Sequence, residues 1–116
     1  MTLEEIRNHC LQKKGVEECF PFGPEVLVFK IGGKIFLLCS LDWYPAFFNA
    51  KADPDWSLEL REQFPQITPG YHMSKKHWNS VQTEGLKPDL IKKIIDHSYD
   101  LVLKSLPKKL QQEINS

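Results

Sequence analysis

The sequence predicts an α+β fold in which helices cover one face of an antiparallel sheet. Two apolar runs, residues 25–31 and 34–40, flank a Gly32-Gly33 pair, which is a strong signal for a two-residue hairpin turn. Apolar residues at helical spacing precede this hairpin and return after it. Hairpin-length connections exclude parallel crossovers, so a two-layer sandwich of a helical layer on one antiparallel sheet is the economical way to bury these faces.

The first expected element is a helix over residues 3–14. Thr2 can cap its N-terminus, and Glu5, three residues later, completes a capping box. Gly15 follows two lysines and is a typical C-terminal stop. A first strand is expected over residues 16–22, where a proline interrupts it.

After the hairpin, we expect a strand over residues 47–51 and a short helix over 55–64. Turn and capping residues separate the two, and Pro54 sits where a first helical turn tolerates proline. The helix has one buried face, because bulky side chains recur at four-residue spacing: Trp56, Leu60 and Phe64.

The last third of the chain predicts a loop, a strand and the longest helix. Residues 65–74 are rich in proline and glycine and are expected to be a loop, and residues 78–83 alternate as a strand does. A helix over about 88–106 ends before Pro107, and residues 108–116 form a polar tail or a last short helix. The helical stripe comprises Leu90, Ile91, Ile94, Ile95, Ser98, Leu101 and Val102. Its serine would let another element approach closely.

Length and composition fit one globular domain spanning residues 1–116, because 41% of the residues are hydrophobic and 26% are charged. No apolar run approaches the roughly 20 residues that span a bilayer. The N-terminal residues lack a signal-peptide core, so a cytoplasmic location is expected. We also expect a monomer and no membrane partner. The cysteines are odd in number and lack CxxC spacing, which favours packing over disulfides or zinc: Cys10, Cys19 and Cys39.

The charge is balanced overall but uneven along the chain. The 15 basic and 15 acidic residues give a net charge of zero, which argues against a strong non-specific nucleic-acid binder. Residues 1–69 carry 7 basic and 10 acidic groups, whereas residues 70–116 carry 8 and 5. An anionic partner should therefore meet the second half first.

Signals for catalysis and for metals are weak. The sequence contains no GxSxG, no HExxH and no phosphate-cradling GxxxxGK[ST] motif. The histidines are scattered, and His72 and His77 are five residues apart rather than at the i, i+4 spacing of a helical metal pair. We expect no enzyme activity, no catalytic residue, no metal site and no cofactor.

The stretch YHMSKKHWNSV, residues 71–81, is the main candidate for binding an anion. Its lysines meet no acid before Glu84, its histidines gain charge below about pH 6.5, and its asparagine can bond a base or a phosphate. The candidate nucleic-acid-binding residues are His72, Lys75, Lys76, His77 and Asn79. A simpler interpretation also stands, because a strand tryptophan such as Trp78 is usually a core anchor and lysines near a loop are usually just solvated.

Two separated motifs resemble the MmcQ/YjbR family. The first lies in ITPGYHMSKKHWNSV and comprises Pro69, Gly70, His72, Met73, Lys75, Lys76, His77, Trp78, Asn79 and Val81. The second lies in the long helix and comprises Ser98, Tyr99, Leu101, Val102, Leu106 and Pro107. The early hairpin adds Phe22, Val28, Phe29, Lys30 and Lys34, so that the resemblance covers nearly the whole chain.

The resemblance implies a frataxin/CyaY-like α+β fold with the N- and C-terminal helices on one side of the sheet. It also implies a role in DNA binding by a double-wing mode that uses sheet loops. In that role Lys75, Lys76 and His77 would contact phosphate, and Trp78 would brace the segment. Two alternatives stay open. One is a protein-interaction module built on the aromatic run WYPAFF, residues 43–48, if that run is exposed. The other is a small-molecule-binding domain around His72, His77, Asn79 and Tyr99.

Overall fold

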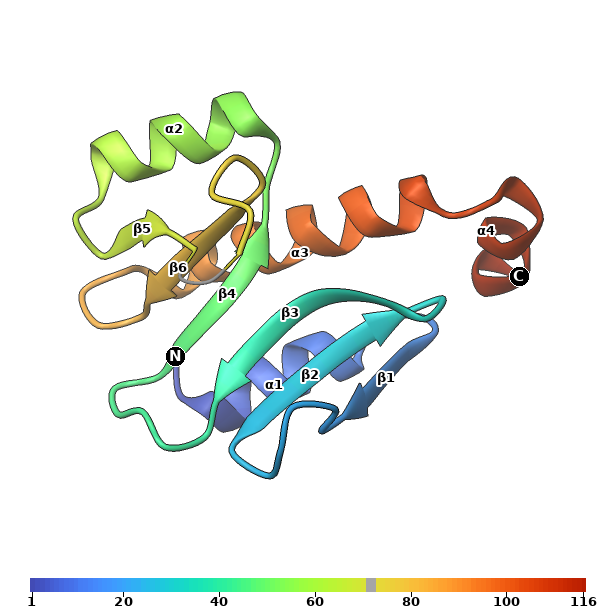
Figure 1. The fold of residues 1–116 in the computed structure, drawn as a ribbon, viewed down its shortest axis with the longest axis horizontal. Coiled ribbons are helices and arrows are strands. Elements are labelled where there is room, and N and C mark those ends of the chain that lie inside the picture. The colour runs from blue at the N-terminus through green and yellow to red at the C-terminus, as the bar shows by residue number, and fades with distance from the viewer. Residues whose placement is uncertain (71–72) are drawn as a thin grey trace.

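The computed structural model describes residues 1–70 and 73–116, which form a six-stranded antiparallel sheet with helices packed against it (Figure 1). The strand order is β1-β2-β3-β4-β6-β5. In chain order the elements are α1 (Leu3–Leu11), β1 (Val16–Cys19), β2 (Val26–Ile31), β3 (Lys34–Ser40), β4 (Phe47–Lys51), α2 (Pro54–Gln63), β5 (Ile67–Pro69), β6 (Trp78–Gln82), α3 (Pro88–Ser105) and α4 (Lys108–Asn115). The predicted α+β class is confirmed.

The hydrophobic core lies between the sheet and the helices. Figure 1 shows α1 and α3 behind the sheet, and α3 contacts β2, β3 and β4. Side chains alternate across each strand, so every second residue points into this core. Phe48 of β4 is directly opposite Val81 of β6, and both are fully buried.

Ser98 links α3 directly to the sheet. Its side chain is completely buried, accepts a hydrogen bond from the Lys51 backbone N–H at 2.8 Å and donates one to the Phe36 carbonyl. A larger residue would push the helix away from the strands at this position. The expectation that this serine permits close approach is confirmed.

The C-terminal residues form a helix, α4, rather than a polar tail. Leu110 and Ile114 of α4 pack against the edge of the core. They lie over two glycine turns: a Cβ at Gly15 would lie 3.1 Å from Ile114, and a Cβ at Gly32 would lie 2.6 Å from Leu106 and 3.1 Å from Leu110. Both glycines have positive φ, so these turns combine a left-handed backbone with tight packing.

The structure corrects several predicted boundaries. The first helix ends at Leu11, and β1 ends at Cys19, before the proline that was expected to interrupt it. Residues 67–69, which were predicted to lie in a loop, form the short edge strand β5, in which Ile67 is opposite Val81 of β6. Cross-strand pairing and the burial of Ile67 outweigh the loop composition around it.

Candidate functional site

The exposed part of the predicted binding segment is a tight turn that leads into β6. The backbone N–H groups of His77 and Trp78 both donate to the Ser74 carbonyl, at 3.2 and 2.9 Å. The His77 carbonyl accepts from the Ala52 N–H at 2.8 Å, which ties the turn to the end of β4. Lys75 is at the tip of this turn, and its side chain is exposed.

Arg61 of α2 also fixes the backbone of this turn, through hydrogen bonds from its guanidinium group. Its Nε donates to Asn79 Oδ1 at 2.7 Å, and its Nη2 donates to the Lys75 carbonyl and, at 3.4 Å, to the Trp78 carbonyl. The planar guanidinium can make several such bonds at once. Arg61 therefore fixes the backbone from which the lysines project, and it was not among the predicted site residues.

The structure places the predicted site residues in different environments. Lys75 and Lys76 are exposed, and within residues 1–70 and 73–116 neither forms an ion pair. His77 is half-buried. His72 lies outside the described residues. The two lysines and His77 are brought together on one turn.

Asn79 requires a correction to its predicted role. Its side chain is only 1% exposed and faces the core side of β6, opposite the buried Ala50 of β4. Since its Oδ1 accepts from Arg61, Asn79 acts as an internal anchor for the arginine rather than a group that contacts a ligand. Side chains alternate between the two faces of β6, so Asn79 lies on the same face as Val81, two residues later. Val81 faces the core because it is paired with the buried Phe48 of β4.

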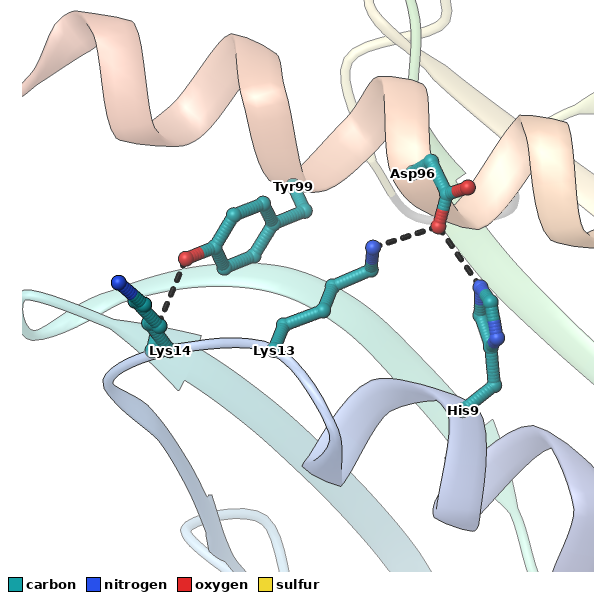
Figure 2. Close-up of polar contacts among 5 residues, drawn as sticks. All are labelled: His9, Lys13, Lys14, Asp96 and Tyr99. Carbon is teal, nitrogen blue, oxygen red and sulfur yellow. Dashed lines mark hydrogen bonds and ion pairs between the residues drawn. The ribbon is translucent and has the colours of Figure 1, made fainter. Parts of the chain in front are cut away.

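A second polar cluster joins α1 to α3 (Figure 2). Asp96 Oδ1 lies 2.7 Å from His9 Nε2 and 2.5 Å from Lys13 Nζ. Burial opposes the ionisation of Asp96, but the hydrogen bonds from Lys13 and His9 outweigh it and hold the pKa of this carboxyl below its usual range. The carboxylate is thus balanced by its neighbours, and the cluster acts as a tie between two helices.

Tyr99 completes this tie instead of approaching the 71–81 segment. Its hydroxyl donates to the Lys14 carbonyl at 2.6 Å (Figure 2). Its ring packs edge-on against Phe36, and the Lys13 ammonium lies 5.2 Å from the ring centroid. The hydroxyl of Tyr99 is thus directed to the end of α1, whereas Asn79 is bound to Arg61, which weakens the small-molecule alternative.

His97 joins α3 to the start of α2. Its Nε2 accepts a hydrogen bond from the Asp53 N–H at 3.0 Å, and the Trp56 ring packs edge-on against it at 4.5 Å between centroids. An acceptor nitrogen must be unprotonated, and burial lowers the pKa of His97 accordingly. The α2 helix that carries Arg61 is thereby fixed at its N-terminus.

The cysteines follow the predicted packing role at two positions. Cys10 and Cys39 are fully buried, and burial raises the pKa of the Cys10 thiol to about 12. Burial raises the pKa of Cys39 as well. These thiols are therefore protonated and unreactive near neutral pH.

Comparison with known proteins identifies the family. The sequence profile described as YjbR matches residues 11–101, which is most of the chain. The chain belongs to the YjbR family. An uncharacterised Escherichia coli O157:H7 protein, YbdF, is 45% identical over 112 residues, covering 96% of this chain and 92% of that protein. The uncharacterised YjbR protein of E. coli K12 is 28% identical over 110 residues, covering 93% and 92%.

Solved structures show the same YjbR-family architecture. Deinococcus radiodurans protein DR2400, with a DUF419 domain, superposes with a TM-score of 0.91 at 36% identity, over 98% of this chain and 88% of that one. A Pseudomonas syringae protein superposes with a TM-score of 0.75 at 23% identity, over 88% and 99%, and supports the fold alone. The resemblance read from the two sequence motifs is confirmed.

Two further observations concern ligands and membranes. Across residues 1–70 and 73–116, no group of three or more His, Cys, Asp or Glu side chains is placed to hold a metal ion. None of the described helices has the length and apolar character to cross a membrane.

Proposed function

We propose that this YjbR-family protein binds DNA weakly through the turn at residues 73–77, without catalysing a reaction. The observation that carries the proposal is the pair Lys75 and Lys76, two adjacent exposed ammonium groups without a carboxylate partner among the described residues. Arg61 and Ser74 fix the backbone beneath them, so that little backbone entropy is lost on binding.

The sheet face beside this turn supports the proposal. Residues that alternate with the buried ones point away from the helices, and near the turn these are mostly polar and uncharged or basic. They are Asn49 and Lys51 of β4, Thr68 of β5 and Trp78 of β6. Hydroxyl, amide and ammonium groups of this kind contact phosphate and sugar in protein–DNA complexes. Trp78, at the start of β6, is half-buried.

The balanced charge of the molecule limits the expected affinity. With two or three phosphates neutralised, the logarithm of the binding constant should fall with the logarithm of the salt concentration with a slope of roughly −2 to −3. Binding should thus be detectable at low salt and largely lost at physiological salt. No base-reading side chain is part of the proposal, because Asn79 is buried.

The test is a salt titration of binding to a labelled DNA duplex by fluorescence anisotropy. Lys75→Ala/Lys76→Ala should lower the affinity at low salt by about tenfold and make the salt slope shallower by about two. The matched control is Lys108→Ala/Lys109→Ala, which removes the same charge from α4, at the far end of the molecule in Figure 1. Equal losses in both variants, or no binding by the wild type at low salt, would refute the proposal.

We also propose a frataxin/CyaY-like arrangement and a cytoplasmic monomer. In support of the former, α1 and α3 lie on one face of the antiparallel sheet. The three cysteines of the chain are free thiols, as suits a reducing compartment. Superposition on a frataxin structure would test the fold assignment, and a poor match of the sheet and these two helices would contradict it. Sedimentation equilibrium tests the monomer, and fractionation of cells tests the compartment.

A protein-interaction role is the second candidate. It is favoured by the aromatic run at residues 43–48, because Trp43 is 56% exposed and Tyr44 is 95% exposed. Phe48, by contrast, is fully buried, so only the first part of the run is available to a partner.

A further inference from the structure

Large apolar side chains gather at one end of the sheet and remain exposed. They come from the β1–β2 and β3–β4 connections, which lie at the same end in Figure 1. The Leu41 N–H donates to the Glu25 carbonyl at 2.8 Å and links the two loops. We call this surface the aromatic end, and it comprises Phe20, Phe22, Leu41, Trp43 and Tyr44.

The exposure of these rings does not come from a loosely held loop. Thr83, just after β6, donates to the Ala46 carbonyl through both its backbone N–H, at 3.1 Å, and its hydroxyl, at 2.8 Å. The Trp43 ring packs on Phe47 with 5.9 Å between centroids. The β3–β4 loop is therefore anchored at its end while Trp43 and Tyr44 project into solvent. Several large exposed apolar side chains at one end of a molecule are typical of interaction sites.

An open groove of about 710 Å³ lies beside the aromatic end. It is bordered by the start of α1, the β3–β4 loop and the β6–α3 connection. Its lining includes four acidic residues, and no Lys, Arg or His is found among the described residues that line it. The carboxylates belong to Glu4, Glu5, Asp42 and Glu84.

One of these carboxylates has a partner within α1, and the other three form no ion pair among the described residues. Hydrogen bonds from Thr2 lower the pKa of Glu5, which caps α1. Glu4, Asp42 and Glu84 take part in none of the ion pairs found among the described residues. The groove thus combines negative charge with exposed indole and phenol rings.

We propose that the aromatic end and its acidic groove dock a basic peptide segment of a partner protein, with an apolar side chain seated among the rings. Arginine and lysine are attracted both to carboxylates and to the faces of Trp and Tyr rings. Exposed Trp and Tyr are the residue types that most often carry binding energy at protein interfaces. A nucleic acid is excluded as the occupant because its phosphates would meet the four carboxylates. The surface is separate from the 73–77 turn, so the inference does not depend on DNA binding.

The test uses the whole chain and two synthetic labelled peptides, Arg-Leu-Arg-Leu-Arg and its counterpart Glu-Leu-Glu-Leu-Glu. Fluorescence anisotropy should show binding of the basic peptide only. NMR chemical-shift changes should map to residues 20–25 and 41–46. Trp43→Ala/Tyr44→Ala should weaken binding by about tenfold or more, as should Asp42→Lys/Glu84→Lys.

Controls separate this surface from other parts of the molecule. Leu58→Ala, which removes an exposed apolar side chain from α2, should leave the peptide affinity unchanged. Circular dichroism should show that every variant stays folded. Equal affinity for both peptides, an unchanged affinity in the Trp43→Ala/Tyr44→Ala variant, or shifts confined to other residues would overturn the proposal. The proposal would also be overturned if the wild type sedimented as a dimer and the Trp43→Ala/Tyr44→Ala variant as a monomer. The occupant would then be a second copy of the chain.

Discussion

Arg61 illustrates how a single side chain can determine the shape of a binding turn. It bridges Asn79 within β6 and the backbone of Lys75, so α2 and the turn are held as one unit. No local pattern in the sequence marks it, because its partners are 14 and 18 residues away along the chain.

Replacing Arg61 should therefore destabilise the protein and loosen the turn. Arg61→Ala leaves the buried Asn79 without its donor, which we expect to lower the free energy of unfolding by about 1–3 kcal/mol in urea denaturation. Glu62→Ala, on the exposed side of the same helix, should change it by less than about 0.5 kcal/mol. Equal effects of the two substitutions would show that Arg61 does not hold the turn.

His97 should make stability depend on pH. Because burial lowers its pKa in the folded state, the unfolded chain binds a proton more readily. The stabilisation is fully present above the unfolded pKa of about 6.5 and is lost as the pH falls through and below that value. The free energy of unfolding should drop below pH 6.5, and the difference between wild type and His97→Gln should shrink there. A pH-independent difference would contradict this account.

At the scale of secondary-structure elements, the β2–β3 hairpin turn is packed against the C-terminal part of the chain. Gly32 and Gly33 both have positive φ, but only Gly32 has neighbours at the position of a Cβ, the side chains of Leu106 and Leu110. A substitution at Gly33 therefore tests the backbone conformation alone, whereas a substitution at Gly32 tests backbone conformation and side-chain packing together.

Gly33→Ala should cost about 1–2 kcal/mol through its left-handed backbone alone. Gly32→Ala should cost more, because its Cβ would lie 2.6 Å from a Leu106 methyl group and 3.1 Å from Leu110 of α4, so both side chains would have to shift. Thermal denaturation of the two variants provides the measurement. A Gly33→Ala variant that is less stable than Gly32→Ala would show that α4 does not pack on this turn.

The elements that could be predicted are those whose signal is local. The Gly32-Gly33 pair and the apolar spacing of the long helix are fixed by backbone and hydrophobic preferences within a few residues. The strand β5 could not be found in this way, because a segment of three residues that includes Pro69 becomes a strand only by pairing with β6. The exposure of Lys75 could likewise be predicted locally. The burial of Asn79 depends on the register between β4 and β6, which no local pattern reveals.

Contacts between segments that are distant in the sequence could not be predicted from local patterns either. His9 and Asp96 are 87 residues apart. The only sequence signal of their pairing is the spacing of His9 and Lys13, which would share one face of the helix predicted over residues 3–14. The partner on α3 is chosen by helix packing.

At the scale of the whole molecule, opposite chemical characters are placed on separate surfaces. The 73–77 turn is basic, whereas the groove beside the aromatic end is acidic, although the whole chain has a net charge of zero. A neutral total can thus conceal two surfaces that would attract different partners.

The two surfaces should behave independently. The effects of Lys75→Ala/Lys76→Ala and Trp43→Ala/Tyr44→Ala on the free energy of unfolding should add to within about 0.5 kcal/mol in the combined variant, because sites without shared contacts are additive. Urea denaturation of the wild type, the two double variants and the combined variant provides this measurement. A coupling energy above about 1 kcal/mol would show that the two surfaces are energetically linked.

The outermost strands of the sheet bear on self-association. Exposed strand edges can template pairing with another chain, as in amyloid, and proline, charge and short length all discourage it. At one border β5 has three residues, the last of which, Pro69, offers no amide hydrogen. At the other, β1 presents the adjacent carboxylates of Glu17 and Glu18. Neither border is therefore a good template for fibril growth, so concentrated solutions of this protein should resist ordered aggregation.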